Sequence, residues 1–416
     1  MGHLELFIEV LIALIIIMVM AQVMGRLSRL LGQPAVVGEM ISGVLLGPTL
    51  FGHFFPAASA AVFPETTMPI LFFVSNLGLS VYMFLVGAEM DLGHFSPKAM
   101  REASVLSAVA IIVPFGFGAL SAVLLDDAIN AKGIPAVQLI IFLGTALAIT
   151  AFPMLARILQ EKGIVNTRIG ALSLLSASMQ DVVSWVLLGL VTAMSTKGSY
   201  TGLLIMVVGA TVLLLVLFLV VRPILRVTAL RVNAPAELSP PAFAVVMGLL
   251  LVCALITDWL GLYSVFGGFV LGLALPREGA YIQALNVRLR DLTVVFLLPV
   301  FFAFSGLNTD LFGLVSAQMV VPTVVIVTFA FLSKYLSCTF TMRWAGGFSW
   351  ADASAVGGLL NARGLMELII ANIGLFYGLI DQSLYSVLVL VAVSTTLAAM
   401  PIYNASLGRA RQSAIG

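Results

Sequence analysis

The stretch LGTALAITAFPML, residues 143 to 155, decides the fold of this chain, because a proline stands late in a long apolar run. Pro153 removes a backbone donor and its ring clashes with the preceding turn, so we expect a helix to be interrupted here. A second interruption is expected in GGLLNARGLMEL, residues 357 to 368, where Gly357, Gly358 and Gly364 surround Asn361. Clustered glycines loosen a helix.

The composition places both stretches in a membrane protein. Of 416 residues, 61% are hydrophobic and only 9% are charged, and the mean hydropathy is +1.15. A soluble domain carries about 25% charged residues, so this chain cannot cover a water-facing surface. At about 20 residues per spanning helix there is room for a dozen or more spans. The net charge of +1 gives no reason to expect nucleic acid as a partner.

Apolar runs separated by charged or turn-rich breaks predict an all-α polytopic protein embedded in a lipid bilayer. The first run has no signal-peptide features, so we expect it to be a retained span. Thirteen helices are expected, at approximately 4–24, 33–52, 68–90, 101–125, 136–160, 169–195, 200–222, 240–257, 260–276, 291–308, 315–342, 352–378 and 383–404.

The basic residues divide unevenly between the two sides of these helices. The loops after even-numbered helices hold only Lys132 and Lys197. The loops after odd-numbered helices hold Arg26, Arg29, Lys98, Arg101, Arg157, Lys162, Arg168, Arg222, Arg226, Arg231, Arg277, Arg288, Arg290, Arg343, Arg409 and Arg411. Cytoplasmic loops carry the excess of Lys and Arg. We therefore expect the N-terminus outside and the C-terminus in the cytoplasm of a cell bounded by this membrane.

An odd number of helices permits two inverted repeats, helices 1–6 and helices 8–13, joined by helix 7. The two predicted interruptions fall in helices 5 and 12, which occupy equivalent places in these repeats. Broken backbone is tolerated at membrane depth only where protein or a water-filled cavity satisfies its polar groups. Paired interruptions in corresponding halves therefore point to a transport site.

Four ionisable residues lie deep within the predicted spans: Asp181, Lys334, Arg363 and Glu367. At about 1.5 Å of rise per residue, the first three lie roughly 13–20 Å from the cytoplasmic face. Charges at this depth are costly, so they face protein or water and find partners. Arg363 and Glu367 are four residues apart and are expected to pair with each other. Asp181 and Lys334 then form the expected remaining pair. Lys334, Arg363 and Glu367 also suit a structural role, in which charges lock helices together or offset the dipoles of broken helices.

Asp181 is the residue that we expect to carry an ion. Ser178 and Ser184 lie three residues on either side of it, on the same helical face. Oxygen ligands from Asp181, Gln180, Thr150 and the unwound backbone of helix 5 suit a hard monovalent cation. A proton and the cation then compete for one carboxylate. The chain has no GxxxxGK[ST] loop for ATP and no metal-ligand cluster of histidines, so no cofactor and no transition-metal site are expected.

Six motifs, in order from about residue 20 to 405, resemble the monovalent cation–proton antiporter family. They are LGQPAVVGEMISGVLLGP (31–48), LGLSVYMFLVGAEMDL (77–92), TAFPML (150–155), SASMQDVV (176–183), LPVFFAFSGLNTDL (298–311) and NARGLMELII (361–370). The similarity is to the second branch of this family, which includes Kef-type potassium efflux systems, GerN- and NapA-like Na⁺/H⁺ antiporters and plant cation/H⁺ exchangers.

The resemblance implies an NhaA/NapA-like fold with crossed discontinuous helices 5 and 12 and a homodimer in a cytoplasmic membrane. It also implies an elevator-like movement. The mobile core would cover approximately 68–195 and 291–378, and the dimerisation scaffold 1–67, 200–290 and 379–405. By matching position, Asp181 is the ion-binding aspartate, Lys334 the lysine that pairs with it, and Thr150 the hydroxyl beside the break. Arg363 and Glu367 match the charged pair, within the motif that begins at Asn361.

The chain also departs from the family pattern. Gln180 precedes Asp181, where strongly electrogenic members have a second aspartate, so a one-for-one exchange is expected unless Lys334 also titrates. No regulatory domain of the Kef type is expected after helix 13. A cation channel and an organic-solute symporter on the same inverted-repeat plan remain alternatives. A membrane-embedded enzyme is disfavoured, because no nucleophile–base pair is predicted at depth. The transported ion is either Na⁺ or K⁺.

Overall fold

In the part of the chain that the structure, a computed structural model, describes, every element of regular secondary structure is a helix. The described residues are 3–90, 96–165, 167–196, 200–230, 232, 234, 238–316 and 318–413. Lys197 and Arg231, two of the residues in the charge pattern, lie outside them. The predicted all-α class is confirmed.

The chain divides into two compact units. Unit 1 comprises Met1–Met18, Ala57–Asp91 and Thr192–Phe304, and unit 2 comprises Val19–Pro56, Leu92–Val191 and Ser305–Gly416. Unit 2 differs from the predicted core in leaving out residues 68–91, 192–195 and 291–304 and in including residues 19–56 and 379–416. The predicted core and dimerisation domains concern movement and assembly, and they stay a prediction.

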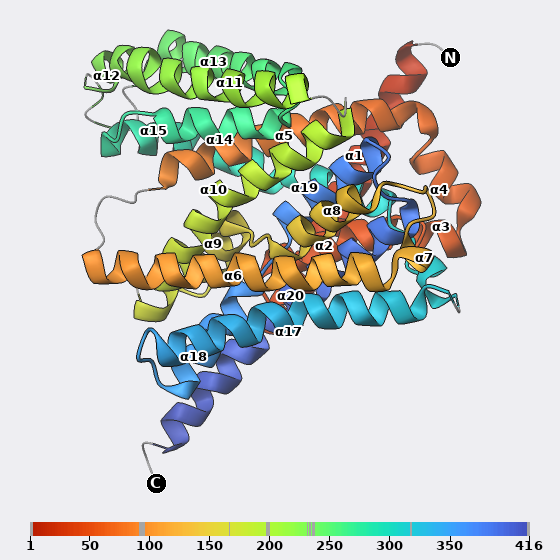
Figure 1. The fold of residues 1–416 in the computed structure, drawn as a ribbon. Helices are drawn as coiled ribbons and strands as arrows, with labels where there is room; N and C mark the ends of the chain where they lie inside the picture. Colours follow the sequence, from red (N-terminus) through yellow and green to blue (C-terminus); the bar gives the residue numbers. More distant parts are fainter. Residues whose placement is uncertain are drawn as a thin grey trace. The chain divides into compact units, whose positions relative to one another are not determined.

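Unit 1 is built around a close pair of helices, α5 (Met68–Glu89) and α14 (Ser264–Ala274), which lie side by side (Figure 1). A Cβ added at Gly268 would lie 2.2 Å from the Ser80 carbonyl oxygen, so this contact requires glycine. The other elements with residues in unit 1 are α1 (His3–Leu30), α4 (Pro56–Val62), η1 (Glu65–Thr67), α11 (Tyr200–Val216), η2 (Leu217–Val221), α12 (Arg222–Ala229), α13 (Pro240–Trp259), α15 (Gly279–Asp291), η4 (Leu292–Leu297) and α16 (Leu298–Leu307).

Unit 2 contains the remaining helices, and α6 and α17 pack along each other within it (Figure 1). Parts of α1 and α16 also belong to it. Its other elements are α2 (Ala35–Leu46), α3 (Phe51–Phe54), α6 (Pro97–Leu124), α7 (Asp126–Ile129), α8 (Ala136–Ala148), α9 (Phe152–Glu161), most of α10 (Arg168–Thr196), η5 (Gly313–Val315), α17 (Val320–Trp344), α18 (Trp350–Leu360), α19 (Leu365–Phe376) and α20 (Gln382–Ser413).

Both expected interruptions are present in unit 2. The first separates α8 from α9 at residues 149–151, and the second separates α18 from α19 at residues 361–364. Pro153 lies in the first turn of α9, where its missing N–H costs nothing. Gly364 precedes α19 with a φ of 55°, a backbone conformation that residues other than glycine rarely adopt. The breaks meet where the Ala151 N–H donates to the Ala362 carbonyl oxygen at 3.4 Å.

Eleven helices of the described part are long and apolar enough to span a membrane. Two predicted spans are not among them. Residues 260–276 form only the 11-residue helix α14, and residues 291–308 are wound as the π-helical η4 followed by the 10-residue α16. The predicted count of thirteen therefore stays a prediction.

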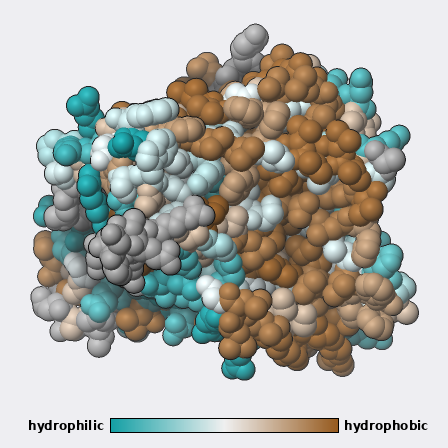
Figure 2. Space-filling model, turned by 90° about the horizontal axis from the view of Figure 1, so that it is seen from below, coloured by the Kyte–Doolittle hydropathy of each residue, from teal (hydrophilic) through white to brown (hydrophobic). Residues whose placement is uncertain are grey.

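The two broken helices are the most buried of these eleven helices. In Ala136–Glu161 and in Trp350–Phe376, 83% of the most apolar window is buried, against 17% in Leu204–Ala229. Figure 2 shows hydrophobic side chains gathered over a broad area of one face. Exposed apolar residues such as Ile112 of α6 and Val321 of α17 need lipid to cover them.

Candidate ion-binding site

Asp181 lies fully buried in the middle of α10 and faces the start of α9. The backbone N–H of Phe152 donates to its Oδ1 at 3.4 Å. A helix N-terminus carries a partial positive charge, so α9 stabilises the ionised carboxylate from one side. The second oxygen, Oδ2, is buried and has no hydrogen-bond partner within the described residues. Among the residues described, one oxygen of the carboxylate therefore has no donor.

A chain of polar side chains leads away from the first break. The Thr150 hydroxyl donates to Gln180 Oε1 at 2.7 Å, and Gln180 Nε2 donates to the Ser176 hydroxyl at 3.1 Å. Ser176 and Ser107 of α6 are joined through their hydroxyls at 3.0 Å. All four residues are buried. The structure thus brings Thr150 and Gln180 together beside Asp181, and it adds Ser176 and Ser107, which the sequence did not single out.

The serines on either side of Asp181 bond to their own helix. Ser178 donates to the Leu175 carbonyl oxygen and Ser184 to the Gln180 carbonyl oxygen, both at 2.8 Å. Each side chain is 2% exposed. Their hydrogens are used inside α10, while each hydroxyl oxygen retains a lone pair that can accept or coordinate.

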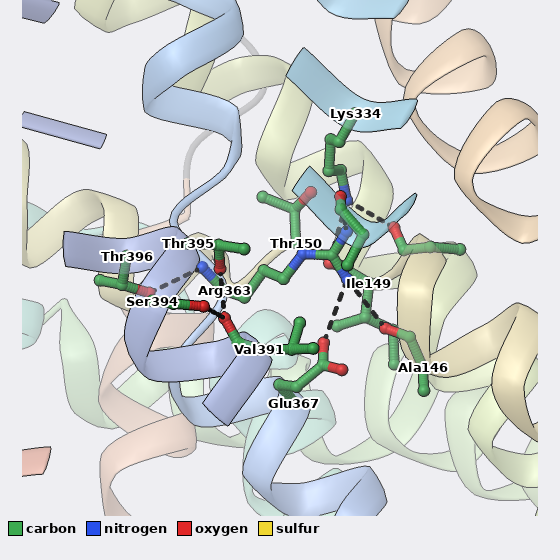
Figure 3. A network of polar contacts seen from close by, with 12 residues as sticks. Ala146, Ile149, Thr150, Lys334, Arg363, Glu367, Val391, Ser394, Thr395 and Thr396 are labelled. Carbon is green, nitrogen blue, oxygen red and sulfur yellow. Dashed lines mark hydrogen bonds and ion pairs between the residues drawn. The ribbon is translucent and has the colours of Figure 1, made fainter. Parts of the chain in front are cut away.

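Lys334 does not pair with Asp181, which corrects the prediction from the sequence. Its ammonium donates to the carbonyl oxygens of Ala148 at 2.6 Å and Ile149 at 2.9 Å (Figure 3). These carbonyls lie at the interrupted end of α8, where they have no partner in the helix and carry partial negative charge. The lysine stabilises this helix end, a role that the sequence had left open.

Arg363 and Glu367 form the expected pair, with 3.3 Å between Arg363 Nη1 and Glu367 Oε2, and both are fully buried. Arg363, within the second break, also donates to the carbonyl oxygens of Ala146 at 3.2 Å (Figure 3) and Ala330 at 2.8 Å, so it ties the break to α8 and α17. In the described part of the chain, Glu367 Oε1 has no hydrogen-bond partner.

Asn361 lies at the end of α18, opposite the first break. Its Nδ2 donates to the Gly357 carbonyl oxygen at 3.1 Å, which caps the helix end. Its Oδ1 is buried and finds no hydrogen-bond donor among the residues described. The side-chain amide nitrogen therefore caps the broken helix, while the side-chain oxygen is left as an acceptor without a donor among the described residues.

Two contacts of α9 were not expected from the sequence. Arg157 lies within α9 and forms a two-point ion pair with the buried Glu39 of α2. Glu161 accepts from the Ala35 N–H at the start of α2. From the sequence, Arg157 was grouped with the loop charges, although the predicted helix 136–160 already included it. The available signal was Glu39, an acidic residue in an apolar run that needed a partner.

Carboxylate, hydroxyl and amide oxygens of Asp181, Thr150 and Gln180 lie at the first break. Oxygen is the donor that hard cations prefer. Within the described ranges, no group of three or more His, Cys, Asp or Glu side chains is placed to hold a metal ion.

Comparison with known proteins identifies the family that this chain resembles. Residues 11–402 match the family model described as "Sodium/hydrogen exchanger, transmembrane". A Na⁺/H⁺ antiporter, NhaS4, from Synechocystis is 34% identical over 390 residues, covering 94% of this chain and 95% of the relative. Cation/H⁺ antiporter 18 of Arabidopsis thaliana is 34% identical over 414 residues, 96% of this chain. K⁺/H⁺ antiporter 1 of Saccharomyces cerevisiae is 32% identical over 378 residues, 89% of this chain.

The chain spans 49% of the plant relative and 43% of the yeast relative. Among solved structures, the sodium proton antiporter MjNhaP1 from Methanocaldococcus jannaschii matches with a TM-score of 0.62 and 13% identity, covering 98% of this chain and 97% of that chain. A second structure of the same antiporter, at pH 8, matches with a TM-score of 0.59 and 16% identity, covering 96% and 97%. At these identities the likeness concerns the fold alone.

Proposed function

Because the chain belongs to the transmembrane sodium/hydrogen exchanger family, we propose that it exchanges Na⁺ or K⁺ for H⁺ with Asp181 as the shared carboxylate. Cation/proton antiport is the activity of the relatives named above. The observation that carries the role of Asp181 is its position in α10, fully buried and facing the N-terminus of α9, with Oδ2 unpartnered within the described residues. A carboxylate so placed takes up either a proton or a cation.

In this proposal the cation is held by Asp181 together with oxygens of neighbouring residues. Thr150 and Gln180 contribute from one side, and Ser178 adds a hydroxyl oxygen from α10. Protonation removes the negative charge that a cation needs, so the two ligands exclude each other. If the site can turn from one side of the membrane to the other only when Asp181 is occupied, the movements of the two ions are coupled.

One carboxylate sets the stoichiometry that we propose, one cation for one proton. Lys334 is engaged with the Ala148 and Ile149 carbonyls and makes no ion pair with Asp181. Gln180, beside Asp181, is not ionisable. A lysine that stays bound to the end of α8 contributes no proton to the cycle, so the exchange moves no net charge.

For the movement itself we propose an elevator. Every residue of the proposed site lies in unit 2, so that unit is a suitable body to carry the ion past a more static scaffold. We also propose a homodimer in a cytoplasmic membrane, with the N-terminus outside and the C-terminus in the cytoplasm. The dimer and the movement rest on the resemblance to the family, and the orientation rests on the asymmetry of basic residues.

A proteoliposome assay tests this function against a channel. Under antiport, added Na⁺ or K⁺ dissipates a preformed pH gradient even when the membrane voltage is clamped. A channel gives an ion current without obligatory proton movement, and an organic-solute symporter leaves the gradient unchanged when inorganic cations are added. Comparing Li⁺, Na⁺, K⁺ and Rb⁺ in the same assay identifies the transported ion.

The Asp181→Asn variant tests the carrier in this assay. We expect it to fold and to lose exchange, because a neutral amide cannot alternate between proton and cation. Asp258→Asn, in the last turn of α13, is the matched control and should keep full activity. Cation-driven proton movement that persists in the Asp181 variant would reject this residue as the carrier.

A further inference from the structure

Helix α9 connects the ion site to α2 over a short, continuous length. Its first residue, Phe152, donates its N–H to Asp181, and its last residue is Glu161. Ten residues at about 1.5 Å each make a segment roughly 15 Å long. Pro153 lies in its first turn, so no break interrupts the helix between Phe152 and its far end.

The far half of α9 is fixed to α2 by an ion pair. Arg157 donates from Nη1 to Glu39 Oε2 at 2.9 Å and from Nη2 to Glu39 Oε1 at 2.6 Å. The side chains are 18% and 8% exposed, respectively. A two-point pair of this kind fixes direction as well as distance, which a single contact does not. It therefore restrains the rotation of α9 about its axis.

Two further contacts hold the same end of the helix. Both carboxylate oxygens of Glu161 accept from the Ala35 N–H, at 3.1 and 3.0 Å, at the start of α2. Lys162 follows α9 and donates to the Gly32 carbonyl oxygen at 2.8 Å. The end of α9 is thus attached both to α2 and to the turn that precedes it.

Helix α2 is itself held firmly enough to serve as an anchor. A Cβ at Gly38 would lie 2.1 Å from the Met24 carbonyl oxygen of α1. Just beyond the other end of α2, a Cβ at Gly47 would lie 2.1 Å from the Gly306 carbonyl oxygen. Backbones that approach this closely leave α2 little freedom to slide.

We infer that Glu39 and Arg157 are positioning residues, which hold the first turn of α9 at the distance and angle that the cation site requires. Neither side chain is proposed to contact the cation. They act through the rigid half-helix, whose Phe152 N–H and preceding Thr150 hydroxyl meet Asp181 and Gln180. This inference rests on the proposed role of Asp181 as the ion carrier.

The test compares Glu39→Gln, Arg157→Lys and the exchanged pair Glu39→Arg with Arg157→Glu, all purified and reconstituted. Each single variant loses the two-point pair, and Arg157→Lys does so while keeping the charge. Outer-shell partners of a metal ligand typically change affinity by about 10–100-fold when they are altered. We therefore expect the KM for the cation to rise about tenfold, with the maximal rate largely kept. The exchanged pair should recover part of the affinity.

Glu278→Gln is the matched control, because it removes an ion pair with Arg226, at 3.3 Å, in unit 1. Its KM should equal that of the wild type. Size-exclusion profiles and melting temperatures identify variants that fold, and if Glu39→Gln does not fold, Arg157→Lys decides the question. An unchanged KM in the folded variants, or an equal rise in the control, overturns the inference. Because Asp181→Asn is measured alongside, exchange that survives in that variant identifies a failure of the proposed function instead.

Discussion

Lys334 and Asp181 serve opposite ends of the same break. The ammonium meets the carbonyl oxygens at the end of α8, and the carboxylate meets the N–H at the start of α9. Each charge therefore opposes the partial charge of the helix end beside it. The two groups differ in how much of their hydrogen-bonding capacity is used. The lysine is bound by two backbone acceptors, whereas Asp181 Oδ2 has no donor among the described residues, which suits the exchange of ligands that we propose for it.

Replacing Lys334 with Gln should lower stability while exchange survives. The variant loses two charge-assisted hydrogen bonds to backbone carbonyls, and such bonds contribute about 1.5–3 kcal/mol each. We expect a clear fall in melting temperature in detergent and cation-driven proton movement in liposomes. Lys98→Gln is the control, because its exposed ion pair with Glu102, at 3.9 Å, contributes little. A stable Lys334 variant without transport would make the lysine part of the cycle and argue against one-for-one exchange.

The two broken helices support each other at the scale of the elements. Gly364 begins the second half of one broken helix and packs against α9 of the other, since a Cβ there would lie 2.3 Å from Met154 Cε. Arg363 adds a bond to the Ala146 carbonyl oxygen of α8. The geometry of one break therefore depends on the other, which explains why both are enclosed by protein.

Gly364→Ala should destabilise the protein and weaken exchange. The residue has a φ of 55°, and alanine there strains the backbone in addition to the contact with Met154. Gly116→Ala in α6 is the matched change, because nothing lies within 4 Å of its added Cβ. An alanine inside a helix is more stable than glycine by about 0.5–1 kcal/mol. Thermal unfolding of both variants should show opposite shifts, and equal shifts would contradict the account.

Local patterns predicted local features well. Pro153 and the glycines around Asn361 predicted both breaks, and the spacing of four residues predicted the contact between Arg363 and Glu367. The partners of Lys334 were missed, because the prediction considered only charged side chains as partners. It left out the backbone carbonyls that a break in a helix exposes. The Glu39–Arg157 contact was missed for another reason. It joins residues 118 positions apart, and no local period reports a contact of that range.

At the scale of the whole molecule, the proposed mechanism depends on which side of the membrane each loop faces. The basic residues predict that loops after odd-numbered helices are cytoplasmic. Lys98, in the first turn of α6, and Lys132, between α7 and α8, then lie on opposite sides. The inverted repeats depend on the same alternation, so orientation and mechanism are linked.

Single cysteines placed at these two lysines should react from opposite sides. In right-side-out vesicles, a membrane-impermeant maleimide is expected to label Lys132→Cys and to leave Lys98→Cys unlabelled until the membrane is opened. The native Cys253 and Cys338 are free and buried, and replacing them with alanine removes any background. Labelling of both positions from outside, or the reverse pattern, would contradict the predicted orientation.

Proton release on cation binding tests the central claim most directly, because it needs neither a membrane nor movement. Detergent-solubilised protein is placed in weakly buffered solution with Asp181 protonated, and Na⁺ or K⁺ is added while a pH indicator is followed. One proton should leave for each cation bound by the wild type, and none should leave Asp181→Asn. Cation binding to the wild type without proton release, or equal release from the variant, would contradict the exchange of two ligands at one carboxylate.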